Sequence, residues 1–168
     1  MTQDEAILHV AAAKRNGRRV VFTYGCFDLL HPGHIRRLEQ ARSLGGILVV
    51  GIMSDAGVRA RKGEGRPVVV QEERAEILCA VEAVDVLAVF EPNALRPWLG
   101  RLSPDIVVTR GGRGADEAIG REEVEAAGGR VVVVLDLPGH STAAILRRIR
   151  ESGTKDALAS SSGVAEQK

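Results

Sequence analysis

Two histidines, separated by a proline and a glycine, stand where an apolar run gives way to a helical pattern, in the segment His31–His34. The run Val20–Thr23 is expected to form a buried strand, and a helix is expected to begin at Pro32. The first turn of a helix presents unpaired N–H groups and a positive dipole end, so it attracts anions. Two imidazoles there can donate hydrogen bonds to phosphate oxygens. The segment predicts a phosphate-binding turn, in which Gly33 lets the phosphate approach the backbone.

Two other interpretations of the histidine pair stay open on the sequence alone. In the first, His31 caps the helix and His34 is a surface residue. In the second, the pair shares a zinc ion, because histidines at positions i and i+3 can do so. A third zinc ligand is hard to find, since His9 belongs to a different helical pattern. Asp28, shortly before the pair, is expected either to orient one imidazole or to fix the turn.

A basic loop with glycines follows the second apolar run, over residues 59–67. It contains Arg61, Lys62 and Arg66, and a mobile loop of this kind can close over phosphates. The same composition is also typical of a solvated basic loop. The segment alone therefore leaves a phosphate-binding role and a purely solvated role open.

Two more segments carry groups suited to anions. Arg110 and Arg113 stand among glycines after the fourth apolar run, where two guanidinium groups can clamp an anion. Ser141 and Thr142 precede the last helical pattern, and their hydroxyls can cap that helix or hold a phosphate.

Strand-like and helical patterns alternate along the chain. Continuous apolar runs, typical of strands covered on both faces, occur at Val20–Thr23, Ile47–Met53, Val84–Phe90, Asp105–Thr109 and Val131–Leu135. Helical patterns occur at Asp4–Asn16, Pro32–Leu44, Ser54–Arg61, Glu72–Val84, Ala94–Leu102, Arg121–Ala127 and Thr142–Glu151. The alternation predicts an α/β fold, a three-layer, Rossmann-like, doubly wound sheet of five parallel strands in a single domain. Ligands of such sheets bind at the carboxyl ends of the strands, so the four segments are expected to converge on one edge.

Length and composition limit the classes of binding partner and the cellular location that are expected for this chain. The chain has 168 residues and a net charge of +1, which gives no general attraction to nucleic acid or to a membrane surface. Cys26 and Cys79 stand alone, and neither a signal peptide nor a membrane-spanning run is present, so a cytoplasmic protein is expected. The expected parts are an N-terminal helix over 1–18, the α/β domain over 19–153 and a disordered, Ser-rich tail over 154–168.

From Arg19 to Arg150, the sequence resembles the HxGH nucleotidyltransferase superfamily, in its cytidylyltransferase-like branch. It is most similar to the adenylyltransferase domains of ADP-heptose synthases, and glycerol-3-phosphate cytidylyltransferases share the start Thr23–Gly25. The resemblance depends on residues 25–34, Ser54-Asp55, residues 62–67, Arg74-Ala75-Glu76, Pro104-Asp105 with Gly111-Gly112, and Ser141-Thr142.

The resemblance implies transfer of AMP from ATP to a phosphorylated sugar similar to heptose 1-phosphate, with release of pyrophosphate. Catalytic roles are implied for His31, His34 and Lys62. Nucleotide-binding roles are implied for Cys26, Phe27, Gly33, Asp55, Ser141 and Thr142, and acceptor-binding roles for Asp28, Arg61, Arg66, Arg110 and Arg113. Mg²⁺ is expected as a cofactor held by phosphates and water, with no protein ligand, and related enzymes imply a homodimer.

The sequence departs from the heptose enzymes in two places. Arg110 and Arg113 stand where those enzymes carry a lysine and an acidic residue, and Ala143 replaces one hydroxyl of their Ser-Thr-Thr motif. Two alternatives therefore stay open. One is a CTP-dependent cytidylyltransferase for glycerol 3-phosphate or a related phosphoalcohol, and the other is a catalytically silent nucleotide-binding protein.

Overall fold

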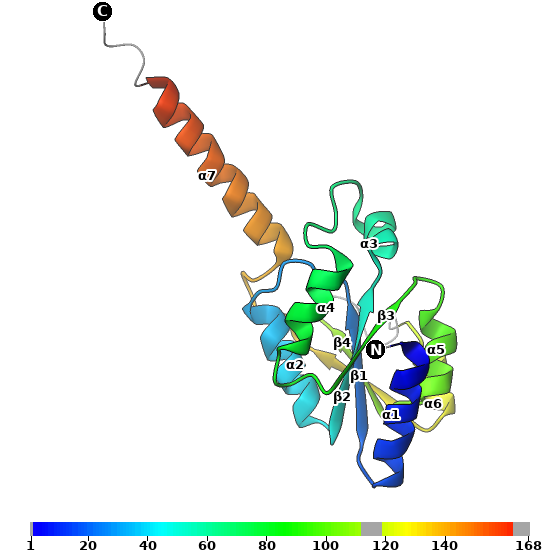
Figure 1. The fold of residues 1–168 in the computed structure, drawn as a ribbon. Helices are drawn as coiled ribbons and strands as arrows, with labels where there is room; N and C mark the ends of the chain where they lie inside the picture. The colour runs from blue at the N-terminus through cyan, green and yellow to red at the C-terminus, as the bar shows by residue number, and fades with distance from the viewer. Residues whose placement is uncertain (1, 112–118, 163–168) are drawn as a thin grey trace, which may run out of the picture.

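A single parallel sheet forms the centre of the molecule (Figure 1). The computed structural model describes residues 2–111 and 119–152, together with the backbone of 153–162. Five strands pair in the order β3-β2-β1-β4-β5, and all pairs are parallel. They are β1 (Val20–Gly25), β2 (Ile47–Met53), β3 (Val86–Phe90), β4 (Ile106–Arg110) and β5 (Arg130–Val134). The chain order reverses between β1 and β4, so ligands are expected at the carboxyl ends of that pair.

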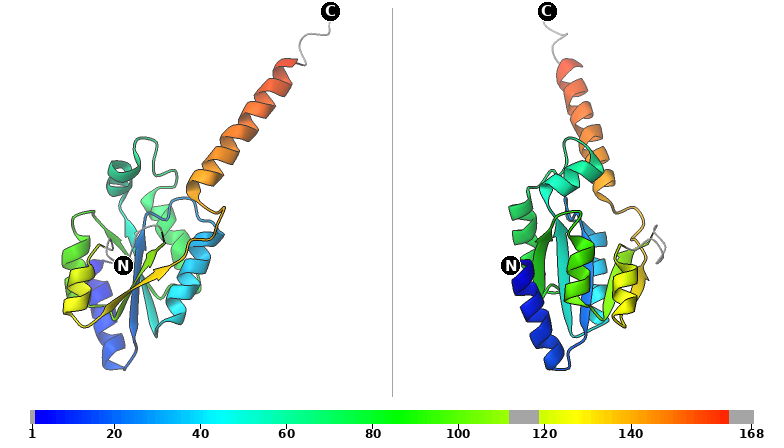
Figure 2. Two further views of the ribbon diagram at one scale, coloured as in Figure 1. Left: turned by 180° about the vertical axis from the view of Figure 1, so that it is seen from behind. Right: turned by 90° about the vertical axis from the view of Figure 1, so that its right-hand side faces the viewer.

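Helices cover both faces of the sheet, as the edge-on view of Figure 2 shows. On one face lie α1 (Gln3–Arg15), α5 (Leu95–Leu102) and α6 (Arg121–Ala126), and on the other lie α2 (Pro32–Ser43) and α4 (Gln71–Cys79). Successive strand residues point to opposite faces, so Phe22 enters the first core and Val21 the second. The continuous apolar runs thus supply both cores, which confirms the three-layer α/β prediction.

Two helices lie beyond the carboxyl ends of the strands (Figure 1). The helix α3 (Asp55–Lys62) follows β2, and Ser54 caps it by accepting the Gly57 N–H at 3.2 Å. The helix α7 (Thr142–Ser162) begins at the same edge and projects away from the sheet. The segments predicted to bind anions follow strands whose carboxyl ends share this edge, and Arg113, in one of them, lies outside the described residues.

Two element boundaries differ from those predicted by more than two residues. The helix α4 ends at Cys79 rather than at Val84, because a turn closed by the Val84 N–H on the Val81 carbonyl follows it. Val81 and Val84 still pack against the α2–α4 core, which is why their apolar spacing imitates further helix.

The tail is the second difference, because α7 continues through residues 154–162, where a disordered tail was predicted. Lys155, Ala157, Leu158 and Ala159 favour helix strongly enough to continue it into the serines. Residues 163–168 of the predicted tail lie outside the described part of the chain. No helix in the described part of the chain is long and apolar enough to cross a membrane.

Candidate active site

The histidine pair lies at the start of α2, after the carboxyl end of β1. His31 is the N-cap residue in extended conformation, Pro32 takes the first turn, and the His31 side chain makes no capping hydrogen bond. The two imidazole rings stack with centroids 3.9 Å apart. A Cβ on Gly33 would meet the His31 ring at 3.1 Å, so the absence of a side chain there lets the ring fold over the backbone.

Both imidazoles are held in the neutral state. Burial lowers the pKa of His34 to about 3, with smaller contributions from the charges of His31 and Arg37. Burial also lowers the pKa of His31, assisted by His140 and Arg37. The Nδ1 atoms of both rings are buried without a hydrogen-bond partner among the described residues. Buried polar atoms are rarely left unpaired in a folded protein, so the two Nδ1 atoms mark this turn as a candidate ligand site.

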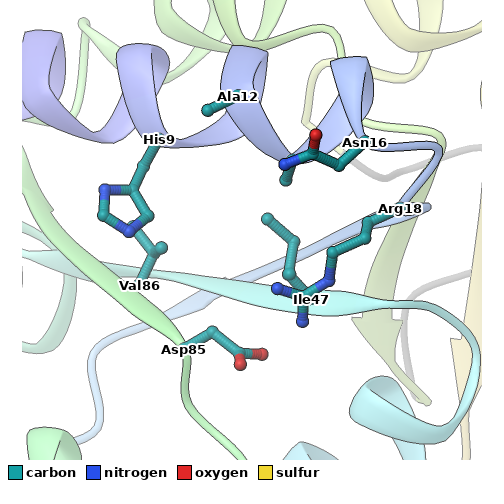
Figure 3. A pocket seen from close by; sticks show the side chains of 8 residues that line it. His9, Ala12, Asn16, Arg18, Ile47, Asp85 and Val86 are labelled. Carbon is teal, nitrogen blue, oxygen red and sulfur yellow. The ribbon is translucent and has the colours of Figure 1, made fainter.

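His9 does not join the pair. It lines a cavity of about 290 Å³ between α1 and the amino ends of β2 and β3, on the opposite edge of the sheet (Figure 3). Within residues 2–111 and 119–152, whose side chains the structure describes, no group of three or more His, Cys, Asp or Glu side chains is placed to hold a metal ion. The described residues therefore supply no third ligand for the zinc alternative.

Two arginines accompany the histidines. Arg37 lies one turn after His34 on α2, is 8% exposed, and places its guanidinium carbon 4.9 Å from the centre of the Phe27 ring. Arg110, at the carboxyl end of β4, forms an exposed ion pair with Asp136 at 3.9 Å. The Arg110 site was predicted from its place after a strand. Arg37 was missed, although its spacing of three residues from His34 puts both on one face of the helix.

The N-terminus of α7 lies against the histidine turn. The Ser141 hydroxyl caps the helix by accepting the Ala144 N–H at 3.1 Å. The Thr142 hydroxyl reaches across to the Leu29 carbonyl at 3.4 Å, two residues before His31. The structure therefore brings the predicted hydroxyls and the histidines together, and it assigns the capping role to Ser141.

Asp28 fixes the basic loop rather than an imidazole. Its carboxylate accepts the N–H groups of Val68 and Val69 at 2.9 and 3.0 Å and pairs with Arg66. Burial raises the pKa of Asp28, but these two N–H groups and the Arg66 guanidinium outweigh it and bring the pKa below its ordinary value. Both charged groups are thus engaged with each other, and their acceptor-binding roles stay predictions.

Arg74 connects the loops around the site, a role that the sequence reasoning missed. Its fully buried guanidinium donates to the carbonyls of Cys26, Met53 and Val69, and it pairs with Asp55 at 2.7 Å. The end of β1, the end of β2, α3 and α4 are therefore held by one side chain. The Asp55 carboxylate, predicted to bind nucleotide, is turned to this interaction.

The backbone at Cys26 and Phe27 forms the sharp turn before Asp28. Phe27 has a φ of 46°, a left-handed conformation that non-glycine residues seldom adopt, and it is held there by burial of its ring. Its ring contacts the His34 ring with centroids 5.3 Å apart. The predicted nucleotide-binding backbone thus adjoins the histidine pair.

Two more of the predicted basic residues lie on the last turn of α3 and not on the histidine turn. Lys62 is exposed at the end of α3. Arg61 lines a cavity of about 230 Å³ whose other walls are mostly apolar, formed by Met53, Gly57, Ala60, Phe90, Pro92, Leu95 and Ile119. Arg113 lies outside the described residues. The catalytic role of Lys62 and the acceptor-binding role of Arg61 stay predictions.

Comparison with known proteins identifies the family. The sequence profile described as cytidylyltransferase-like matches residues 22–156. The chain belongs to the cytidylyltransferase-like family. This membership confirms the prediction of a nucleotidyltransferase of that branch.

Two curated relatives of this cytidylyltransferase-like chain are bifunctional proteins named HldE. Identity is 47% over 140 residues for Geobacter sulfurreducens and 43% over 149 residues for Pelobacter propionicus. The alignments cover 83% and 89% of this chain, but 29% and 30% of the relatives, so the chain spans less than a third of their length.

A solved structure shares the fold. The lipopolysaccharide core biosynthesis protein from Thermoplasma volcanium is 26% identical, with a TM-score of 0.59 over 72% of this chain and 98% of that one. The agreement confirms the α/β fold of the chain independently of the sequence profile.

The acidic residues of this cytidylyltransferase-like site are paired with arginines. Asp28 contacts Arg66, Asp55 contacts Arg74, and Asp136 faces Arg110. Such carboxylates are poorly placed to bind a divalent cation directly. An Mg²⁺ ion held by substrate phosphates and water stays a prediction.

Proposed function

We propose that this chain transfers AMP from ATP to a phosphorylated sugar similar to heptose 1-phosphate, releasing pyrophosphate. The observation that carries the proposal is the histidine turn itself. Two neutral imidazoles with unpaired nitrogens stand at a helix start, beside the switch between β1 and β4. The HldE relatives and the lipopolysaccharide core biosynthesis protein support a sugar acceptor.

The reaction needs positioning and charge stabilisation more than a general base. A phosphate monoester has a second pKa of about 6, so the acceptor is already a dianion near neutral pH and attacks the α-phosphorus directly. His31 and His34 donate hydrogen bonds to α-phosphate oxygens as negative charge builds there. The N-terminus of α7, with Thr142, faces the same turn and suits the β- and γ-phosphates.

Three further groups complete the proposal. Lys62 and Arg61, on the last turn of α3, are assigned to oxygens of the acceptor or the triphosphate. Mg²⁺ supplies charge neutralisation on the triphosphate when bound. A homodimer and a cytoplasmic location stay predictions, the second supported by the free thiols of Cys26 and Cys79.

A cytidylyltransferase acting on glycerol 3-phosphate or a related phosphoalcohol is the second candidate. It is supported by the cytidylyltransferase-like profile. A catalytically silent nucleotide-binding protein is the third candidate, and it is supported by Arg110 and Arg113, which stand in place of a lysine and an acidic residue of the heptose enzymes.

One experiment separates the three candidates. The purified chain is incubated with ATP or CTP and with a panel of sugar 1-phosphates and phosphoalcohols, and pyrophosphate is measured. Pyrophosphate with ATP and a sugar phosphate supports the proposal, and pyrophosphate only with CTP supports the second candidate. Nucleotide binding without pyrophosphate from any pair contradicts both enzyme assignments.

A further inference from the structure

Arg37 is a buried cation without a counter-charge. Its side chain extends from α2 under the carboxyl end of β1, and only 8% of the residue is exposed. Its Nε atom is buried and has no hydrogen-bond partner within the described residues. A Cβ on Gly25 would lie 3.4 Å from the Arg37 Nη2 atom, which places the guanidinium beside the end of β1.

The nearby acidic groups do not neutralise this charge. Asp136 is the carboxylate that most favours the charged form of Arg37, but it is exposed and faces Arg110 at 3.9 Å. Asp28 is engaged with Arg66 and two backbone N–H groups. The Phe27 ring gives the guanidinium a cation–π contact, which offsets only part of the cost of burying a charge.

Arg37 nevertheless stays charged at neutral pH. Burial, together with the positive charge of Arg110, lowers its pKa to about 10, which is still well above neutrality. Two guanidinium groups therefore face the end of the β1–β4 pair, one from α2 and one from β4. Arginine forks suit phosphate oxygens, and a phosphate would relieve both the unpaired donor and the repulsion between the cations.

We propose that Arg37 binds a phosphate group of the substrate nucleotide, next to the oxygens held by His31 and His34. This inference rests on the proposed nucleotidyl transfer and adds a residue to its binding site. The rival explanation is structural, because the guanidinium could serve only to cover the Phe27 ring. The two explanations predict opposite effects on the protein without ligand.

The decisive variant is Arg37→Leu, which keeps apolar contact with Phe27 and removes the charge. If Arg37 binds phosphate, removing an unpaired buried charge leaves the melting temperature without ligand unchanged or higher. The affinity for ATP, measured by calorimetry, should fall about 10- to 100-fold, since a charged hydrogen bond is lost. Arg36→Leu is the matched control, because Arg36 is the exposed neighbour on the same helix and its loss should leave affinity unchanged.

Two results overturn the proposal. The first is an Arg37→Leu variant that binds ATP as tightly as the unaltered chain does. The second is an Arg37→Leu variant with a lower melting temperature, combined with an Arg37→Lys variant that restores neither the stability nor the ATP affinity. If Arg37→Leu does not fold, the unaltered chain still provides the test by NMR. The Nε–H resonance of Arg37 should shift when tripolyphosphate is added, and an unchanged resonance contradicts the proposal.

Failure of the proposed reaction has a different signature. Tripolyphosphate carries no base, ribose or acceptor, so its binding tests the phosphate site alone. An unaltered chain that binds tripolyphosphate through Arg37 but yields no pyrophosphate with any nucleotide and acceptor contradicts the transfer reaction and leaves the anion site standing. A chain that produces pyrophosphate equally well with Arg37→Leu contradicts the Arg37 assignment only.

Discussion

The imidazole rings of His31 and His34 stack with their centroids 3.9 Å apart, in a turn that leaves the Nδ1 atom of each without a partner among the described residues. Protonating both would place two positive charges almost in contact, beside the guanidinium of Arg37. The pair is therefore neutral before substrate binds. In the proposed reaction the two rings would act as hydrogen-bond donors, and a bound phosphate would supply the negative charge that the turn lacks.

Replacing His34 with alanine should lower kcat about 10²- to 10³-fold, because one donor to the developing charge is lost. The fold should survive, since the imidazole makes no described hydrogen bond through its buried Nδ1 atom. Pyrophosphate release under saturating substrates measures the effect. His9→Ala, on the opposite edge of the sheet, is the control and should keep full activity. Near-normal turnover of the His34 variant would sink the proposed mechanism.

Stability should depend on the ionisation of His34. Folding lowers the pKa of His34 from 6.5 to about 3. Between pH 6.5 and pH 3, His34 is therefore protonated in the unfolded chain and neutral in the folded chain. The free energy of unfolding therefore declines as pH falls from 6.5 towards 3, by on the order of 2 kcal/mol at pH 4.5. Urea denaturation at pH 7 and pH 4.5 measures the decline. The free energy of unfolding of the His34→Asn variant should decline less over the same pH range. An equal decline in both proteins would contradict the assignment of this pH dependence to His34.

Asp28→Asn should destabilise the protein by about 2–3 kcal/mol at pH 7, because it leaves the half-buried Arg66 without its counter-ion and weakens the bonds to Val68 and Val69. Urea denaturation again provides the measurement. Glu64→Gln, an exposed acid in the same loop, should change the free energy of unfolding by less than about 0.5 kcal/mol. Equal effects of the two substitutions would show that the Asp28 contacts do not hold the loop.

Arg61→Ala should raise the KM for the acceptor about tenfold or more, with a smaller change in the KM for the nucleotide. Among the described residues that line the mostly apolar cavity beside α3, Arg61 alone is charged, and it is the group proposed above to bind the acceptor. Arg59→Ala removes an exposed arginine of the same helix and should leave both constants unchanged. If the two variants behave alike, the cavity is not the acceptor site.

Apolar runs and turn residues predicted the architecture well, because β1 to β4 are largely buried and because a Thr or Ser side chain caps the start of α1, α3 and α7. The end of α4 was misplaced since Val81 packs on the core from a turn, where spacing alone cannot tell helix from turn. Arg37 and Arg74 escaped the sequence reasoning for a physical reason. Arginines are mostly exposed, and only the fold shows which of them are buried against a carbonyl or a ring.

The pairing of β1 with β4 has a consequence for how the protein is made. Val21 lies opposite Ile106, and the Val20 N–H bonds the Asp105 carboxylate across 85 residues of sequence. Contacts between such distant residues close slowly, because the intervening chain must first give up its freedom. The strands β1 to β3 can pair before β4 is available, because they are close in sequence. The proposed site at the ends of β1 and β4 forms only after β4 has joined the sheet. A fragment truncated ahead of Ile106 should therefore fail to bind nucleotide.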